Sequence, residues 1–225
     1  MKLFFTPVLI HWKELVPGFW TTLTIAISAI ALSLVGGLLL ALARESDRRA
    51  IRWLSVAYMD VFRNTPFVVQ LFFFYYGLPE LGIRIDALTT GIVALALTTS
   101  TNTAEAIRAG IASIQGGILE AARASGLSHL QTLRAIVLPL AFRFAIRPLG
   151  SIFVNLVLTT SVVSTITVDD LMSGAENLAS ETYRPFEVYI VVLVFYCAIT
   201  FAVSGTVNIV SALWLRRSAE RLAVA

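Results

Sequence analysis

The sequence EAARASGLSHLQTLRAIVLP, from Glu120 to Pro139, decides the fold because it is a polar stretch between two long apolar segments. It opens with a run of helix formers, and Gly126 follows where a helix end favours a residue with positive φ. Ser128 and Gln131 are spaced for a capping box that starts a second helix. Pro139 is predicted to end that helix, because its ring lacks the backbone N–H and clashes with the preceding turn. The stretch therefore predicts two short helices that project into water as a docking loop for a soluble partner.

The composition is that of a membrane protein. Hydrophobic residues make up 57% of the 225 residues and charged residues only 14%, whereas soluble domains average about 25% charged residues. The mean hydropathy of +0.82 agrees with this interpretation. We expect one all-α domain, an integral membrane helical bundle over residues 1–225, with the docking loop at about residues 111–143. The lone Cys197 leaves no disulfide or cysteine metal cluster within one chain.

Five segments are long and apolar enough to cross a bilayer core, which needs about 20 residues of helix. We predict transmembrane helices near residues 17–43, 54–78, 88–110, 148–166 and 186–213. The first contains Gly36 and Gly37, which favour close helix packing. The second is predicted to bend or break at the segment Asn64 to Pro66. The third carries a polar run at residues 98–103, which must face protein or a water-filled path.

The basic residues predict the orientation of the bundle. If the N-terminus lies outside, 12 of the 17 basic residues fall on the cytoplasmic side, as the positive-inside rule requires. These residues are Arg44, Arg48, Arg49, Arg52, Arg108, Arg123, Arg134, Arg143, Arg147, Arg216, Arg217 and Arg221. The N-out, C-in arrangement places the docking loop in the cytoplasm. It also explains the net charge of +3 without a nucleic-acid partner.

The docking loop resembles the EAA loop of bacterial ABC importer permeases, the membrane subunits of ATP-driven uptake systems. The matching positions are Glu120, Ala121, Ala122, Gly126, Ile136, Leu138 and Pro139. In that family the loop is a cytoplasmic coupling helix that sits in a groove of the ATP-binding subunit. The resemblance implies a type I ABC importer fold, with Glu120 facing basic groups of the ATPase and Gly126 forming the turn. An ordinary helical hairpin between two spans is the structural alternative.

Other segments narrow the resemblance to the polar amino acid uptake family. The similar residues are Phe62 to Pro66, Val69 to Leu71, and the Glu-x-x-Arg-x-Gly element of Glu105, Arg108 and Gly110. The sequence departs from the family pattern at Thr101-Asn102 and Leu158-Thr159. A role in substrate binding that the family would imply at these positions is therefore open. The segment from Ala175 to Val188 is similar to acidic amino acid permeases and favours glutamate or aspartate as the substrate.

Seven polar residues are candidates for a substrate path, because ionisable and polar groups in spans are costly and point to function. They are Asp60, Arg63, Asn102, Glu105, Thr159, Thr160 and Ser161. Two structural alternatives are open: Asp60 and Arg63 pair with each other across three residues, and the hydroxyl groups at 159–161 bond to their own backbone four residues earlier. Asp169 and Asp170 are interpreted as solvated loop charges.

The sequence contains no phosphate-binding loop of the Walker type and no convincing catalytic pair, so we expect a transport subunit that is not an enzyme. The resemblance implies that ATP is bound by separate ATPase subunits and that this chain needs no cofactor or metal. It also implies a second permease subunit, identical or a sister chain, an extracytoplasmic solute-binding protein, and a multi-pass location in lipid of the bacterial inner membrane. The first rival is a self-sufficient secondary transporter or channel with Asp60, Glu105 and Arg108 as its ion relay. An intramembrane enzyme ranks last.

Overall fold

The computed structural model describes residues 4–114 and 116–223, with side chains as far as residue 213, and this part of the chain is helical without β-strands. The long helices are α2 (Leu15–Arg44), α6 (Ala87–Ala112), α9 (Leu138–Thr159) and α11 (Pro185–Ala223). The short α-helices are α1 (Thr6–His11), α3 (Arg49–Arg63), α4 (Phe67–Phe72), α5 (Leu78–Glu80), α7 (Gly116–Ala124), α8 (His129–Thr132) and α10 (Leu171–Thr182). The 3₁₀ segments are η1 (Trp12–Glu14) and η4 (Thr160–Ile166), and the π-helical turns are η2 (Phe73–Gly77) and η3 (Leu133–Val137).

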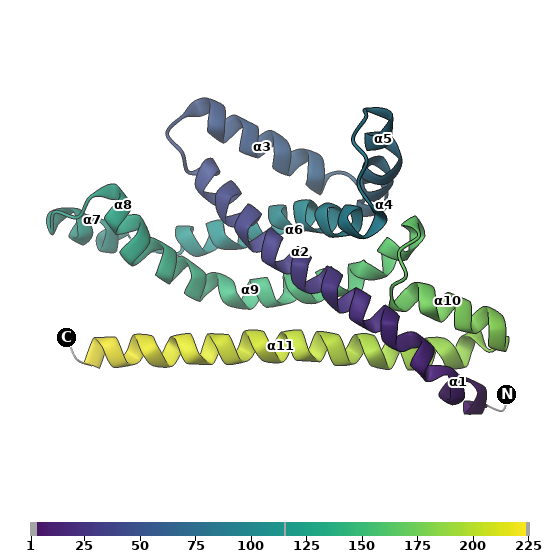
Figure 1. The fold of residues 1–225 in the computed structure, drawn as a ribbon. Coiled ribbons are helices and arrows are strands. Elements are labelled where there is room, and N and C mark those ends of the chain that lie inside the picture. The colour runs from purple at the N-terminus through teal and green to yellow at the C-terminus, as the bar shows by residue number, and fades with distance from the viewer. Residues whose placement is uncertain (1–3, 115, 224–225) are drawn as a thin grey trace.

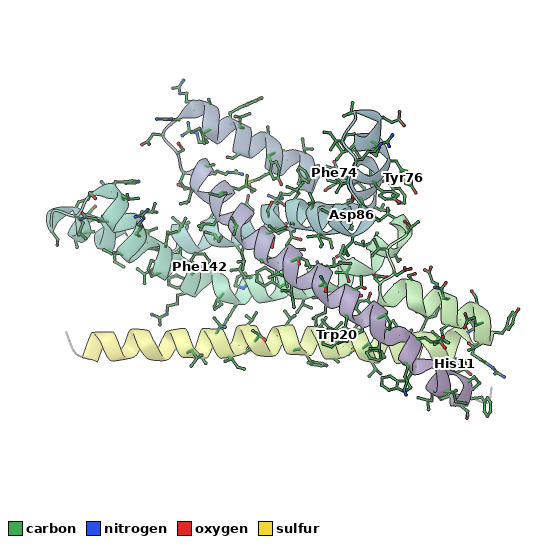
Figure 2. The ribbon with its side chains drawn as sticks, viewed as in Figure 1. His11, Trp20, Phe74, Tyr76, Asp86 and Phe142 are labelled. Carbon is green, nitrogen blue, oxygen red and sulfur yellow. The ribbon has the colours of Figure 1, made fainter. Side chains whose placement is uncertain are left out.

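The long helices form one bundle in the order α2, α6, α9, α11, each packed against the next (Figure 1). The largest apolar cluster lies between α2, α6 and α9 and includes Ile25, Leu95 and Val157, all buried. A second cluster joins the start of α2 to α10 and α11. Trp20 lies on the outside of α2 near its start, where an aromatic ring suits a membrane interface (Figure 2).

Small residues allow the helices of this bundle to approach closely. A Cβ atom added at Gly37 would overlap the side chain of Thr103 on α6, and one added at Gly36 would lie 3.2 Å from Ser100 Cβ. A Cβ atom added at Gly110 would overlap the backbone of Ala141 on α9. The predicted close packing at Gly36 and Gly37 is confirmed, and Gly110 marks the tighter contact between α6 and α9.

Three helical stretches are long and apolar enough to span a membrane: Thr6–Arg44, His129–Ile166 and Pro185–Leu213. They contain the first, fourth and fifth predicted spans. The second predicted span is broken as expected, since α3 ends at Arg63 and Pro66 precedes α4. The third is the continuous helix α6, whose polar residues Thr99, Ser100, Thr101 and Thr103 are buried within the protein. The number of spans and the N-out orientation stay predictions.

Pro139 does not end the second helix of the docking loop, which corrects one prediction. The chain passes from α8 through the π-helical turn η3 directly into α9, where Pro139 occupies the first turn. In the wider turn, the N–H of Leu138 bonds to the carbonyl of Leu133, five residues earlier. The π turn therefore accommodates a residue without an N–H, and the docking loop is continuous with the helix that follows it.

Asp170 is fully buried, so its interpretation as a solvated loop charge was wrong. Its Oδ1 accepts a 2.9 Å hydrogen bond from the N–H of Ser173 and caps α10. The N–H of Leu171 donates to Thr22 Oγ1 at 3.1 Å, and a Cβ on Gly18 would lie 2.5 Å from the Asp170 carbonyl oxygen. The start of α10 is therefore packed directly on the start of α2.

Stability is expected to fall with rising pH because of Asp170, which lies between the predicted spans. Burial raises the pKa of its carboxyl from 3.8 to about 6. The folded protein therefore holds the proton more tightly than the unfolded chain, and this stabilisation is lost as the pH rises from about 4 to about 6. Between pH 5 and pH 7.5 we expect Asp170→Asn, which keeps a capping oxygen, to remove about 1.4 kcal/mol of pH dependence, because the pKa of about 6 lies about one pH unit above the lower of these two values. Thermal unfolding in detergent at pH 5 and pH 7.5 measures it.

Asp170→Ala is the matched variant, because it loses both the charge and the cap. We expect it to be less stable than Asp170→Asn at both pH values by about 1 kcal/mol. A wild-type protein and an Asp170→Asn variant with the same pH dependence would contradict the assignment to this carboxyl.

Candidate docking loop and translocation path

The turn of the docking loop is built by Gly126. Its φ is +76°, the left-handed region that glycine adopts without strain. The N–H of Gly126 donates to the carbonyl of Arg123 at 2.9 Å, and the N–H of Leu127 donates to that of Ala122 at 3.2 Å. This pair of bonds is the Schellman motif, which closes the C-terminus of α7. The predicted conformation of Gly126 is confirmed.

The second helix begins with the predicted capping box. Ser128 Oγ accepts a 3.3 Å hydrogen bond from the N–H of Gln131, and the Gln131 side chain accepts one of 2.8 Å from the N–H of Ser128. Both sides of the turn are therefore closed by local hydrogen bonds. The loop holds its shape at the end of the bundle where Figure 1 shows α7 and α8.

The matched residues of the loop divide into an outer and an inner set. Glu120, Ala121 and Gly126 are exposed, whereas Ala122 is buried and anchors α7. Ile136, Leu138 and Pro139 are half-buried at the junction with α9. The outer surface also presents Leu130, which is 53% exposed, and Ile118, which is 38% exposed. Sequence reasoning missed these two side chains, although apolar residues in a polar loop are a readable sign of a contact surface.

Glu105 joins three helices through arginine side chains. Its carboxylate lies 2.9 Å from Arg108 on the same helix, 3.3 Å from Arg63 on α3 and 3.5 Å from Arg44 on α2. Arg108 also lies 3.4 Å from Glu45. These five residues form what we call the arginine–glutamate cluster. Because its members are about one-third to one-half exposed, each pair is worth about 1 kcal/mol or less, and the cluster positions the helix ends.

The alternative that pairs Asp60 with Arg63 is contradicted, because Arg63 pairs with Glu105 across the interface with α6. Asp60 is exposed, and its backbone carbonyl accepts a 2.7 Å hydrogen bond from the side chain of Asn64 at the end of α3. Asn102 is exposed on α6, one turn before Glu105. The structure thus brings Arg63 and Glu105 together, but Asp60 has no ion pair within the described residues.

The hydroxyl groups at residues 159–161 bond to their own backbone. Thr159 donates to the Asn155 carbonyl at 2.8 Å, Thr160 to Val157 at 2.7 Å, and Ser161 to Leu158 at 2.8 Å. The structural alternative is confirmed for Thr159, whereas Thr160 and Ser161 bond to carbonyls three residues earlier and not four. α9 ends at Thr159, and Thr160 and Ser161 lie in the 3₁₀ segment η4 that continues it.

Gln70 has a structural role that sequence reasoning did not assign. Its Nε2 donates to the carbonyls of Phe62 at 2.9 Å and Thr65 at 2.8 Å, and its Oε1 accepts from Thr98 at 2.6 Å. The buried amide therefore satisfies the carbonyls freed by the break between α3 and α4, and it ties the break to α6. A glutamine within an aromatic run was the available signal.

Phe142 lies near the start of α9 (Figure 2) and connects this helix to the end of the bundle that carries the arginine–glutamate cluster. Its ring packs against two apolar clusters, one with Ala41, Met59 and Ile107 and one with Ala145 and neighbouring residues. Glu105, the end of α2 and the start of α9 therefore share one end of the bundle with the docking loop. Packed side chains therefore connect the docking loop to α9 and α6.

A helical membrane bundle with a rigid, exposed loop at one end has the form of a transporter subunit that receives its driving force from a separate protein. The chain belongs to the family of binding-protein-dependent transport system inner membrane components, whose model matches residues 33–221. It is an amino-acid ABC transporter permease of the inner membrane, and it is not itself an enzyme.

The similar proteins agree on this class. The chain is 42% identical over 191 residues to the "Probable glutamine ABC transporter permease protein GlnM" of Bacillus subtilis (strain 168), covering 85% of this chain and 88% of that protein. It is 37% identical over 206 residues to the nopaline transport system permease protein NocM of Agrobacterium fabrum, covering 87% and 86%. A crystal structure of an amino acid ABC transporter with histidines matches with a TM-score of 0.85 and 32% identity, over 94% of this chain and 99% of that one.

Proposed function

We propose that this chain is one half of the translocation path of an amino acid importer and that its docking loop, at about residues 111–143, binds a separate ATPase subunit. The observation that carries the proposal is the doubly closed turn at Gly126 and Ser128, which holds Glu120 and Leu130 exposed at the end of the bundle. An exposed leucine and an exposed glutamate on one loop suit a groove of the ATPase that has apolar walls and basic residues at its edge. ATP is bound by the partner and not by this chain.

Coupling follows from the continuity of the loop with α9. A movement of α8 passes through the π turn into α9, and the contact between Gly110 and Ala141 passes it to α6. Two such subunits, identical or sister chains, enclose the path, and an extracytoplasmic binding protein delivers the substrate. ATP binding then brings the two docking loops together and changes the access of the path from outside to inside.

The proposed substrate is a polar amino acid, with glutamate or aspartate first. Support for the class comes from relatives named for glutamine and nopaline and from the structure named for histidines. The acidic choice is supported by the similarity of residues 175–188 to acidic amino acid permeases; these residues lie in α10 and at the start of α11. Glutamine is the discriminating competitor, because it differs from glutamate only in the amide.

The secondary-transporter alternative has less support. Its proposed relay residues Glu105 and Arg108 are paired with each other, and each has further ion pairs in the arginine–glutamate cluster at the end of the bundle that carries the docking loop. An ion relay needs a titratable group deeper in the path.

Reconstitution tests the proposed function. Proteoliposomes with this permease alone should show no uptake of labelled glutamate under a proton or sodium gradient. Addition of the ATPase, the binding protein and ATP should start uptake, and unlabelled glutamate or aspartate should compete at least tenfold better than glutamine. Gradient-driven flux by the permease alone would overturn the importer assignment, whereas better competition by glutamine would overturn only the acidic preference.

A further inference from the structure

A strongly basic pocket lies where α2 ends and α3 begins. It has a volume of about 480 Å³, and we call it the basic pocket. Its lining residues are Arg44, Glu45, Arg49, Arg52, Trp53, Val56 and Arg108. Four guanidinium groups against one carboxylate give it a net positive charge, so its natural occupant is an anion.

Two of these arginines are available to a ligand. Arg44 and Arg108 are engaged by Glu105 and Glu45 in the arginine–glutamate cluster. Arg49 and Arg52 are exposed and form no ion pair within the described residues. They lie three residues apart in the first turn of α3, so their side chains project from the same face of the helix. Two planar guanidinium groups on one helix face are suited to donate hydrogen bonds to the oxygens of a phosphate group.

The surroundings of the basic pocket favour a lipid over a soluble anion. Trp53, which lines the pocket, is 68% exposed, as is usual for an indole at a membrane interface. Further round α3, Leu54 and Val61 are 61% and 62% exposed. A phosphate site for a soluble ion needs no such apolar neighbour, whereas a phospholipid presents a phosphate and acyl chains together.

We propose that the basic pocket binds the phosphate headgroup of an anionic phospholipid from the predicted cytoplasmic leaflet. Arg49 and Arg52 contact the phosphate, Trp53 lies at the depth of the headgroup, and the acyl chains follow Leu54 and Val61. Basic pockets at the cytoplasmic ends of membrane helices bind such headgroups. The lipid neutralises the charge that Glu45 and Glu105 leave uncompensated, and it holds α3 against the end of α2.

The test uses the full-length permease in bilayer nanodiscs and the double variant Arg49→Gln/Arg52→Gln. At about 1 kcal/mol for each arginine, the two substitutions should weaken retention of phosphatidylglycerol about 30-fold. Native mass spectrometry of the protein released into mild detergent measures the retained lipid. Quenching of Trp53 by brominated phosphatidylglycerol, compared with brominated phosphatidylcholine, gives the position of the headgroup in a protein whose other three tryptophans are changed to phenylalanine.

Arg143→Gln/Arg147→Gln is the control, since it removes the same charge from exposed arginines of α9 outside the pocket. It should retain phosphatidylglycerol as the wild type does. Equal loss in both double variants would show a general charge effect and overturn the proposal. Displacement of the lipid by millimolar inorganic phosphate would assign the pocket to a soluble anion, and loss of ATPase binding with unchanged lipid retention would assign it to the partner protein. Either result overturns the lipid site.

Discussion

Replacing Gly126 with aspartate is expected to abolish ATP-driven uptake and association with the ATPase, while membrane insertion is unchanged. The residue has a φ of +76°, where a side chain costs about 1–2 kcal/mol. Apart from its chain neighbours, no atom of the described residues lies within 4 Å of an added Cβ, so the new side chain does not disturb the bundle and points into the space where the partner is proposed to bind. An added carboxylate also makes the docking surface more negative. Co-purification of the ATPase and uptake in proteoliposomes measure the effect.

Gly82→Asp is the matched control for the strain of a left-handed residue. Gly82 has a φ of +83°, has open space around its Cβ position, and lies in the turn after α5, which is predicted to be on the outer side. It should lose a similar amount of stability and still bind the ATPase. Normal ATP-driven uptake by Gly126→Asp, or the same loss in Gly82→Asp, would count against the docking assignment.

Gly110→Ala is expected to destabilise the bundle, although alanine is a better helix former than glycine. The intrinsic preference favours alanine by about 1 kcal/mol, but the added Cβ overlaps the backbone of Ala141, which cannot rotate away as a side chain does. Forcing the helices apart costs about 1–3 kcal/mol and separates α6 from α9. We expect a lower unfolding temperature in detergent and at least a tenfold loss of uptake.

Gly205→Ala on α11 provides the comparison, because in the part of the chain that the structure describes no atom outside the adjoining helix backbone lies within 4 Å of its added Cβ. Without an overlap only the helix preference acts, and this variant should be as stable as the wild type or slightly more stable. If Gly110→Ala matches Gly205→Ala in both stability and uptake, the close contact of α6 with α9 is not needed for the fold or for coupling.

Local features of the chain could be predicted because they depend on neighbouring residues. The left-handed turn at Gly126 and the capping box of Ser128 are closed by hydrogen bonds over three to five residues, and the break before Pro66 follows from its ring. Pro139 was predicted wrongly for a related reason. The missing N–H of Pro139 is evident from the sequence, but the sequence does not show that a π-helical turn before it lets the helix continue.

The partners of the charged residues could not be predicted in the same way. The spacing of three residues on one helix left a pair of Arg63 with Asp60 open, yet Arg63 pairs with Glu105, which is 42 positions away. Asp170 was read as exposed because it follows another aspartate in a polar segment, yet it is buried where α10 packs on Gly18. Both outcomes depend on which helix lies alongside, and this is set by packing between distant segments.

The sequence alone determined that this is a helical membrane protein with a docking loop of known family pattern, because hydrophobicity, charge and capping are properties of residues close together in the chain. Only the tertiary structure decided which arginines form ion pairs with Glu105 and which carbonyls at the break before α4 accept hydrogen bonds from Gln70. It also decided that Arg49 and Arg52 line an open pocket. These contacts join helices that are distant in sequence, and their geometry exists only once α2, α3 and α6 are packed together.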